Sequence, residues 1–238
     1  MTTLLEIDNL NAWYGSSHVL HGASLSIDEG EIVALAGRNG SGRSTLAKAL
    51  MGLVHAQGVA NFRGVSMLGK RPYAIARMGV GYVPEQRDVF PTLSVRENLQ
   101  LGMKRGGSRL TARFTLNDAE QLFPVLQERA AVKAGMLSGG EQQMLALART
   151  LMGDPSFVIV DEPTEGLAPQ VMAQVSSCLK KMRERGVAIL LIEQRMSIAR
   201  DLASRVAVMG HGAIVFDDTP AALAANERVI SEWLSVGG

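Results

Sequence analysis

The sequence predicts an α/β protein in which a largely parallel β-sheet is covered by helices on both faces. Short apolar runs that lack the alternation of half-exposed strands, such as 157–160 and 187–192, are separated by stretches with helical periodicity. A glycine-rich loop, residues 37–45, follows another such strand and leads into a helix. Because parallel strands need crossover connections, this alternation of strands and helices indicates the fold class.

The individual elements follow from the same patterns. Strands are predicted at 4–10, 23–27, 31–36, 79–83, 157–160, 187–192, 205–209 and 213–216, and helices at 44–52, 139–152, 169–185 and 220–234. The helix at 169–185 should end at Gly186, because glycine adopts the left-handed conformation that commonly ends a helix. Residues 95–127 form a more polar helical block, which Gly106, Gly107 and Pro124 interrupt.

Composition limits the class of protein. The 238 residues suit one α/β domain with a small subdomain, and 47% hydrophobic residues are enough for a sizeable core. A net charge of +1 argues against broad attraction to nucleic acid or to an anionic membrane. The single cysteine, Cys178, excludes an internal disulfide and fits a reducing cytosol. No apolar run reaches the roughly 18 residues of a membrane span, residues 1–8 show no secretory signal, and the four histidines lack metal-like spacing.

The glycine-rich loop matches the phosphate-binding pattern Gly-x-x-x-x-Gly-Lys-Ser/Thr at all but one position. Glycines let backbone N–H groups approach phosphate oxygens, and the N-terminus of the following helix favours the same negative charge. Its candidate nucleotide-binding residues are Gly37, Asn39, Gly40, Ser41, Gly42, Arg43, Ser44 and Thr45, of which Ser44 is placed to bind Mg²⁺. A glycine-rich turn without a ligand would explain the loop alone, but not the strand and the helix on its two sides.

Arg43 is the departure from the pattern, because it occupies the position where lysine is expected. Arginine keeps the positive charge, so phosphate binding should survive. Its guanidinium is a wide planar fork, however, whereas the lysine ammonium is a compact charge. We therefore expect Arg43 to act in catalysis, but with the risk that crowding misplaces the terminal phosphate and slows hydrolysis.

Two carboxylates, Asp161 and Glu162, follow the apolar strand at 157–160. Active sites of open α/β sheets lie at the carboxyl ends of the strands. Asp161 is therefore predicted to hold Mg²⁺, and Glu162 to polarise the attacking water as a general base. The alternative is a pair of solvated loop acids.

Residues 137–143, Leu-Ser-Gly-Gly-Glu-Gln-Gln, are the most informative segment. Ser138 and Glu141 form a capping box ahead of an amphipathic helix, and a capped helix start is the simplest explanation. Gly139 and Gly140 argue against it, because each weakens a helix by roughly 1 kcal/mol relative to alanine. A helix start without side chains instead offers free N–H groups to an anion that approaches closely.

In this order, the three motifs resemble the ATP-binding subunit of an ABC transporter over nearly the whole chain. The resemblance implies a single ABC ATPase domain, 1–238. Its P-loop NTPase core would comprise 1–86 and 137–238 and include a small antiparallel β subdomain, with an α-helical subdomain at 87–136. It also implies that residues 138–141 contact the γ-phosphate of ATP held by a second ATPase subunit, so that two cassettes enclose two ATP molecules.

The same resemblance implies further site residues. Tyr14 matches the aromatic residue that stacks on adenine, although Trp13 precedes it and could be confused with it. Glu85 and Gln86 both fit the loop that senses Mg²⁺ and the γ-phosphate, and the choice between them stays open, with Gln86 as a candidate metal ligand. Gln194 occupies the position of the family's switch histidine; glutamine can hydrogen-bond a phosphate oxygen or water but cannot carry a proton charge.

Apolar residues after this loop have two possible roles. In the family this region forms a groove for a helix of the membrane subunit, and exposed apolar side chains would suit that contact. Ordinary packing inside the helical subdomain would explain them equally well. The residues are Val89, Phe90, Pro91, Leu93 and Met103.

Within the family, segments 83–85, 89–91, 165–169 and 193–194 resemble importers of branched-chain or other hydrophobic amino acids, including their urea and amide relatives. This implies an ATP- and Mg²⁺-dependent ATPase at the cytoplasmic face of a bacterial plasma membrane, bound to permease subunits. The solute itself, and whether the ATPase pair is a homodimer or a heterodimer, are not encoded in this chain.

Two alternatives remain. The first is a nucleotide-gating subunit whose partner does most of the hydrolysis, and Arg43 motivates it. The second is an ABC ATPase of nucleic-acid metabolism. Such proteins carry a long coiled coil or tandem cassettes, whereas only about 50 residues separate Gln86 from Leu137 here.

Overall fold

The computed structural model describes residues 2–103, 112–194 and 196–234. Its larger sheet has the strand order β10-β9-β3-β8-β7-β6. Neighbours from β9 to β6 run parallel, and β10 pairs antiparallel with β9. The strands are β3 (Ile32–Ala36), β6 (Val80–Val83), β7 (Phe157–Asp161), β8 (Ala188–Ile192), β9 (Arg205–Gly210) and β10 (Ala213–Asp218). The predicted, largely parallel sheet is thereby confirmed, and its strand limits differ from the predicted ones by no more than two residues.

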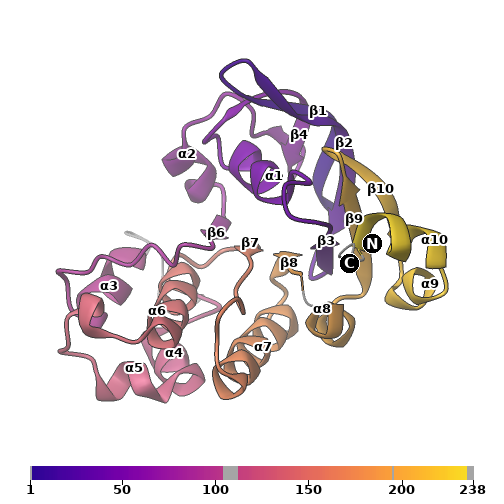
Figure 1. The fold of residues 1–238 in the computed structure, drawn as a ribbon. Coiled ribbons are helices and arrows are strands. Elements are labelled where there is room, and N and C mark those ends of the chain that lie inside the picture. Colours follow the sequence, from indigo (N-terminus) through magenta and orange to yellow (C-terminus); the bar gives the residue numbers. More distant parts are fainter. Residues whose placement is uncertain (1, 104–111, 195, 235–238) are drawn as a thin grey trace.

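The central strands β3, β7 and β8 are buried on both faces, which explains their continuous apolar runs. Along β7, for example, Val158 and Val160 pack into one hydrophobic core, whereas Phe157 and Ile159 pack into the other. In Figure 1, α1 (Arg43–Leu50) and the antiparallel sheet lie on one side of these strands. The helices α6 (Gly139–Leu151), α7 (Pro169–Glu184) and α8 (Met196–Leu202) lie on the other.

A second, antiparallel sheet has the order β2-β1-β4-β5. Its strands are β1 (Thr3–Tyr14), β2 (Ser17–Asp28), β4 (His55–Phe62) and β5 (Val65–Ser66). The first two are longer than predicted, and β4 and β5 were not predicted. In β4, Gly58 interrupts the strand pattern: it lies at a register shift where a Cβ atom would clash with the Asn9 carbonyl oxygen. Pairing with β1 therefore stabilises a strand that its own sequence hardly signals.

The helices agree with the predictions in part. The helices at 44–52, 139–152 and 169–185 are confirmed as α1, α6 and α7, and α7 is followed by Gly186 at a φ of 78°. The prediction missed α8 and the six-residue α2 (Pro72–Arg77). The tail is not one helix but α9 (Pro220–Ala224), α10 (Glu227–Val229) and a π-helical turn, Ile230–Leu234.

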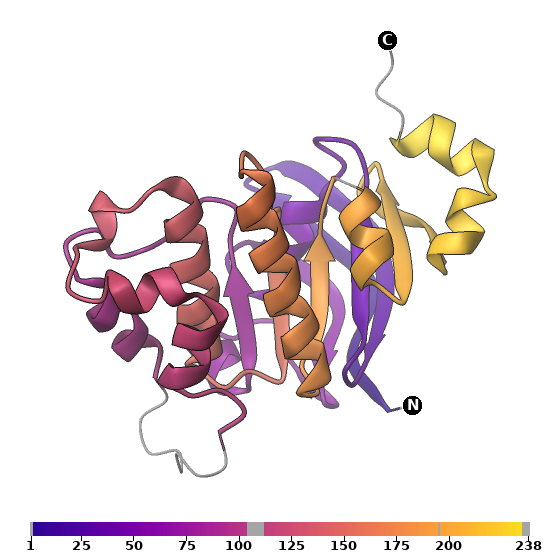
Figure 2. The ribbon, with the colours of Figure 1, turned by 90° about the horizontal axis from the view of Figure 1, so that it is seen from below.

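The polar block between β6 and α6 forms short helices: α3 (Val95–Gly102), α4 (Leu116–Leu122) and α5 (Pro124–Glu128), with a 3₁₀ turn at Ala134–Met136. Pro124 separates α4 from α5 as predicted, whereas Gly106 and Gly107 lie outside the described residues. These helices and α6 make a lobe at one end of the molecule (Figure 2). Among the described helices, none has the length and apolar character needed to cross a membrane.

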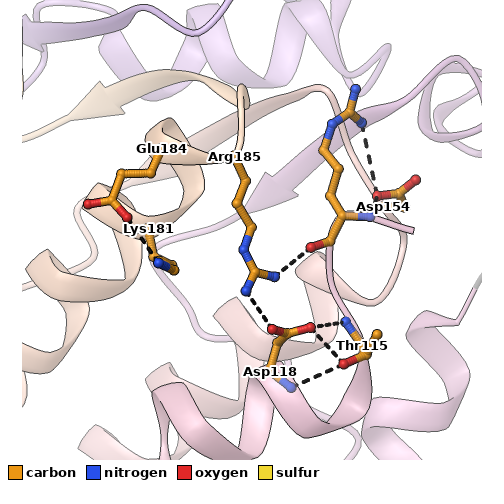
Figure 3. Close-up of polar contacts among 7 residues, drawn as sticks. Thr115, Asp118, Asp154, Lys181, Glu184 and Arg185 are labelled. Atoms are coloured by element: carbon orange, nitrogen blue, oxygen red, sulfur yellow. Dashed lines mark hydrogen bonds and ion pairs between the residues drawn. The ribbon is translucent and has the colours of Figure 1, made fainter. Parts of the chain in front are cut away.

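A polar network joins this lobe to α7 (Figure 3). Arg185 Nη2 contacts Asp118 Oδ1 at 2.5 Å, and Arg185 Nη1 donates to the Arg113 carbonyl oxygen at 2.5 Å. Asp118 also accepts from the backbone N–H and the hydroxyl of Thr115, at 2.7 and 2.6 Å, and so caps α4. The Arg185 guanidinium stacks on the Phe114 ring, 4.7 Å from its centre. This network, here called the α4–α7 network, fixes the lobe to the end of α7.

Candidate active site at the phosphate loop

Four loops converge at the carboxyl ends of β3, β8, β7 and β6, which are neighbours in the sheet. They carry the phosphate loop, Gln194, the Asp161–Glu162 pair and Glu85, respectively. A cavity of about 320 Å³ lies between them. Its described lining residues are Val19, Asn39, Gly40, Ser41, Gly42, Arg43, Ser44, Thr45, Glu85, Glu162, Glu165 and Gln194. The sheet topology thus brings together residues that are far apart in the sequence.

The backbone of the phosphate loop is shaped by glycines. Gly42 has a φ of 110° and precedes α1 as its N-cap, where no described side chain caps the helix. Gly37 packs so tightly that a Cβ atom there would lie 2.5 Å from the Met209 carbonyl oxygen. At Gly40, by contrast, a Cβ atom would meet nothing within 4 Å in the described structure, because this glycine borders the cavity. The first-turn N–H groups of α1 are therefore available to an anion.

Two polar atoms in the loop are buried and have no hydrogen-bond partner within the described part of the chain: Ser41 Oγ and Arg43 Nη1. Leaving a buried polar group unpaired costs about 1–3 kcal/mol, and more for a charged group, so such atoms require an explanation. Phosphate oxygens are acceptors that suit both donors. The loop therefore fits the phosphates of a nucleotide.

Arg43 is only 5% exposed and forms an ion pair with Glu162, which is 9% exposed and also lines the cavity. The Arg43 Nη2 atom lies 2.9 Å from Glu162 Oε1 and donates to Asn39 Oδ1 at 3.3 Å. The other carboxylate oxygen of Glu162 accepts from Gln194 Nε2 at 2.7 Å. Glu162 has a φ of 47°, an uncommon value that its backbone N–H, bonded to the Ile192 carbonyl at 2.9 Å, helps to fix.

Asp161 lies behind this pair and is fully buried. It accepts from Ser44 Oγ at 3.2 Å. Burial raises the pKa of the Asp161 carboxyl to about 6; the hydrogen bond from Ser44 opposes this increase, and the negative charges of Glu162 and Glu85 add to it. A hydroxyl and a carboxylate at one point are the hard oxygen ligands that Mg²⁺ prefers, so the residues fit this ion.

Glu85 and Gln86, in the loop after β6, are both exposed, but only Glu85 is among the described lining residues of the cavity. Glu165, from the loop after the acidic pair, and Val19, from β2, also line the cavity. Neither was predicted as a site residue. Glu165 belongs to the segment 165–169, which stood out in the sequence for its resemblance to amino-acid importers. Val19 gave no sequence signal, since nothing in β2 distinguishes it from other strand residues.

The two aromatic residues at the end of β1, Trp13 and Tyr14, have different surroundings. Trp13 stacks on His18 with ring centres 4.5 Å apart and lies 5.4 Å from His55. Tyr14 is 44% exposed and is not among the described lining residues of the cavity. Of the two, Tyr14 therefore has the ring that a ligand can reach.

The segment at 138–141 lies outside this cavity. Its capping box is confirmed: Ser138 N donates to Glu141 Oε2 at 2.7 Å, and Glu141 N donates to Ser138 Oγ at 3.3 Å. Gly139 and Gly140 are partly exposed at the start of α6, and the Arg87 side chain lies over Gly139. The helix start thus faces outward rather than toward this chain's own phosphate loop.

Comparison with known proteins agrees with this geometry. The family model described as ABC transporter matches residues 20–165. The branched-chain amino acid transport ATP-binding protein BraG of Pseudomonas aeruginosa is 39% identical, over 97% of this chain and 99% of its own. The LivF protein of Archaeoglobus fulgidus, named as a probable branched-chain amino acid transport ATP-binding protein, is 32% identical over 94% and 96% of the two chains.

Solved structures give the same result. The ADP conformation of an ATP-binding cassette from an ABC transporter superposes with a TM-score of 0.79 at 26% identity, over 98% of this chain and 96% of the other. Another ATP-binding subunit of an ABC transporter reaches 0.84 at 25% identity, over 97% and 96%. The predicted fold class and family are thereby confirmed: the chain belongs to the ABC transporter family, as an ATP-binding cassette whose ATPase activity is coupled to transport.

Proposed function

We propose that the chain is the ATP-binding and ATP-hydrolysing subunit of a bacterial importer of branched-chain or other hydrophobic amino acids. The observation that carries the enzymatic part is the convergence of the phosphate loop, Glu162 and Gln194 at one cavity, with Asp161 hydrogen-bonded to Ser44 of the loop. The amino-acid class rests on the relatives BraG and LivF, both named for branched-chain amino acid transport.

The phosphates of ATP would be held by the amides of the phosphate loop, by Ser41 and by Arg43, whose unpaired atoms are described above. Thr45, Asn39, Gly40 and Gly42, which line the cavity, would complete this cradle, and Gly37 would shape the loop behind it. The exposed ring of Tyr14 would stack on adenine. Ser44 and Asp161 would hold Mg²⁺, with Gln86 as a further candidate ligand. When bound, Mg²⁺ supplies neutralising charge to the phosphate oxygens.

Glu162 would polarise the attacking water, and Gln194 would orient it. The 2.7 Å contact between their side chains supports this division of roles, because an amide that donates to the carboxylate leaves its own oxygen available as an acceptor. Glu85, which faces the cavity, is the better placed of the two candidates for sensing the γ-phosphate.

Residues 138–141 would complete the site of a second cassette, and the outward orientation of the α6 start supports this proposal. Permease subunits would contact the lobe formed within 87–136, and the cassette would lie at the cytoplasmic face of the membrane. One solved relative, at 26% identity, is part of an ABC transporter complex. The exposed Phe90 ring, held over Arg149, is a suitable contact for such a partner.

Reconstitution tests the proposal. The chain, with its permease and partner ATPase in proteoliposomes, should couple ATP hydrolysis to leucine uptake, and Glu162→Gln should lower ATP turnover by at least about 100-fold. The gating alternative, which the relatives do not favour, expects little loss from this substitution. The matched control is Glu165→Gln, which removes a neighbouring carboxylate of the same cavity. Uptake of a solute other than a hydrophobic amino acid would overturn the substrate assignment alone.

A further inference from the structure

The cation of the phosphate loop already has an anionic partner in this chain. Arg43 Nη2 contacts Glu162 Oε1 at 2.9 Å, and both side chains are more than nine-tenths buried. Arg43 Nη1 has no hydrogen-bond partner in the described structure. The guanidinium therefore uses one part of its fork on a carboxylate and leaves another part unused.

Glu162 is engaged at both oxygens, by Arg43 on one side and by Gln194 on the other. Both oxygens of this carboxylate already have a donor, so a water that approaches Glu162 has to compete with these two contacts. In this arrangement Glu162 also stands where an incoming phosphate would meet the guanidinium. Carboxylate and phosphate are alternative partners for the same planar fork.

We propose that Glu162 is an internal anion that holds Arg43 in the nucleotide-free cassette, so that the phosphates of the nucleotide must displace it. Nucleotide binding then does two things at once: it gives both ends of the guanidinium a partner, and it releases Glu162 to act on water. The contact is autoinhibitory, because neither phosphate binding nor water activation is complete while it persists. This inference rests on the function proposed above.

Arginine is necessary for such an exchange in this chain. Its fork reaches Asn39 and Glu162 from one nitrogen while a second nitrogen stays in the cavity wall. Lysine at this position would present one compact ammonium and no separate second donor. The replacement of lysine by arginine and the contact with Glu162 therefore both serve the exchange of Glu162 for phosphate.

The test measures affinity rather than hydrolysis. Inorganic pyrophosphate and ADP are titrated into the isolated, nucleotide-free chain by calorimetry, so that neither turnover nor pairing around ATP contributes. Glu162→Gln and Glu162→Ala should both tighten binding by about tenfold, since each removes the competing charge. In the Arg43→Lys background, the same substitutions at Glu162 should change affinity by less than about twofold. Glu184→Gln, which removes an exposed carboxylate of α7 that lies outside the cavity lining, is the control and should also change affinity by less than about twofold.

Thermal unfolding provides a second readout. Without ligand, Glu162→Ala should lower Tm, because the buried Arg43 loses its partner; with pyrophosphate, the increase in Tm should be larger than in the unaltered chain. A purely structural pair would lower Tm without any gain in affinity, and this result would overturn the inference. Equal effects of Glu162→Gln in the unaltered and the Arg43→Lys backgrounds would also overturn it, as would equal effects of Glu184→Gln and Glu162→Gln. If no variant binds ADP or ATP at all, the proposed function itself fails.

Discussion

The cassette contains two clusters that are built from the same kinds of side chain but differ in whether all their buried polar atoms have hydrogen-bond partners. In the α4–α7 network, Arg185 and Asp118 are 30% and 17% exposed, yet the described donors and acceptors are matched on both sides of the pair. In the active site, Arg43 and Glu162 are 5% and 9% exposed, yet Arg43 Nη1 has no partner in the described structure. The more deeply buried ion pair, Arg43 with Glu162, is therefore the one with an unpaired donor.

This difference indicates which cluster serves a ligand. A buried donor without an acceptor costs more than an exposed one, and where such a donor also lines a cavity, a ligand can supply the acceptor. Arg185 has a partner for each of its two terminal nitrogens, and a ring to stack on, within the folded chain. Arg43 does not, and its unpaired nitrogen at the cavity supports the proposed ligand-binding role without reference to the sequence motif.

The hydroxyls of the two clusters offer the largest expected contrast. Ser44 Oγ donates to Asp161 at 3.2 Å, and Thr115 Oγ1 donates to Asp118 at 2.6 Å. Ser44→Ala should lower ATP turnover by about 10- to 100-fold, because it removes a proposed Mg²⁺ ligand. Thr115→Ala should leave turnover within about twofold while it destabilises the fold by about 1 kcal/mol through the lost cap. Steady-state ATPase assays and urea unfolding of both variants check this, and equal losses of turnover would remove the distinction.

Sequence reasoning found those parts of the site that are local in the chain. Continuous apolar runs located β3, β7 and β8, and the glycine pattern located the loop between β3 and α1. The capping box at Ser138 and Glu141 was equally local. Each of these signals depends on neighbours within a few residues.

The remaining parts depend on contacts between distant segments. The pairing of Arg43 with Glu162 joins residues from two loops that lie far apart in the sequence and depends on one rotamer of a long side chain. Whether Glu85 or Gln86 lines the cavity depends on the conformation of the loop after β6. Sequence spacing, which was ambiguous by one residue, could not predict that conformation. Strand β4, with Gly58 opposite a register shift in β1, is stabilised by β1 rather than by local propensity.

The α4–α7 network should matter more for stability than an exposed ion pair in the same view (Figure 3). Asp118→Ala removes the contact with Arg185 and two hydrogen bonds to Thr115, and should lower the free energy of unfolding by about 1–2 kcal/mol. The control is Glu184→Gln, which breaks the exposed 3.1 Å contact between Lys181 and Glu184 and should cost only a few tenths of a kcal/mol. Urea unfolding of both variants measures the difference. Similar costs would mean that the network does not fix the lobe.

The smallest expected effect concerns how stability depends on pH. Asp118 and Asp161 should contribute to the free energy of unfolding with pH dependences of opposite sign. The hydrogen bond from Arg185 lowers the pKa of Asp118 to about 2, so its contribution is fully present above the unfolded pKa of about 3.9 and is lost as pH falls toward 2. Burial raises the pKa of Asp161 to about 6, so the folded state binds the extra proton between about pH 4 and 6, and stability falls as pH rises through that window.

Unfolding of the ligand-free chain, followed by Tm across about pH 2 to 7, separates the two carboxylates. Asp118→Asn should reduce the loss of Tm below about pH 4, and Asp161→Asn should reduce the decline between about pH 4 and 6. Each substitution is the control for the other, because each should leave the other's window unchanged. If Asp161→Asn flattened the acid side instead, the buried aspartate would be ionised throughout. The two clusters would then differ in their hydrogen bonding, but their carboxylates would not differ in ionisation.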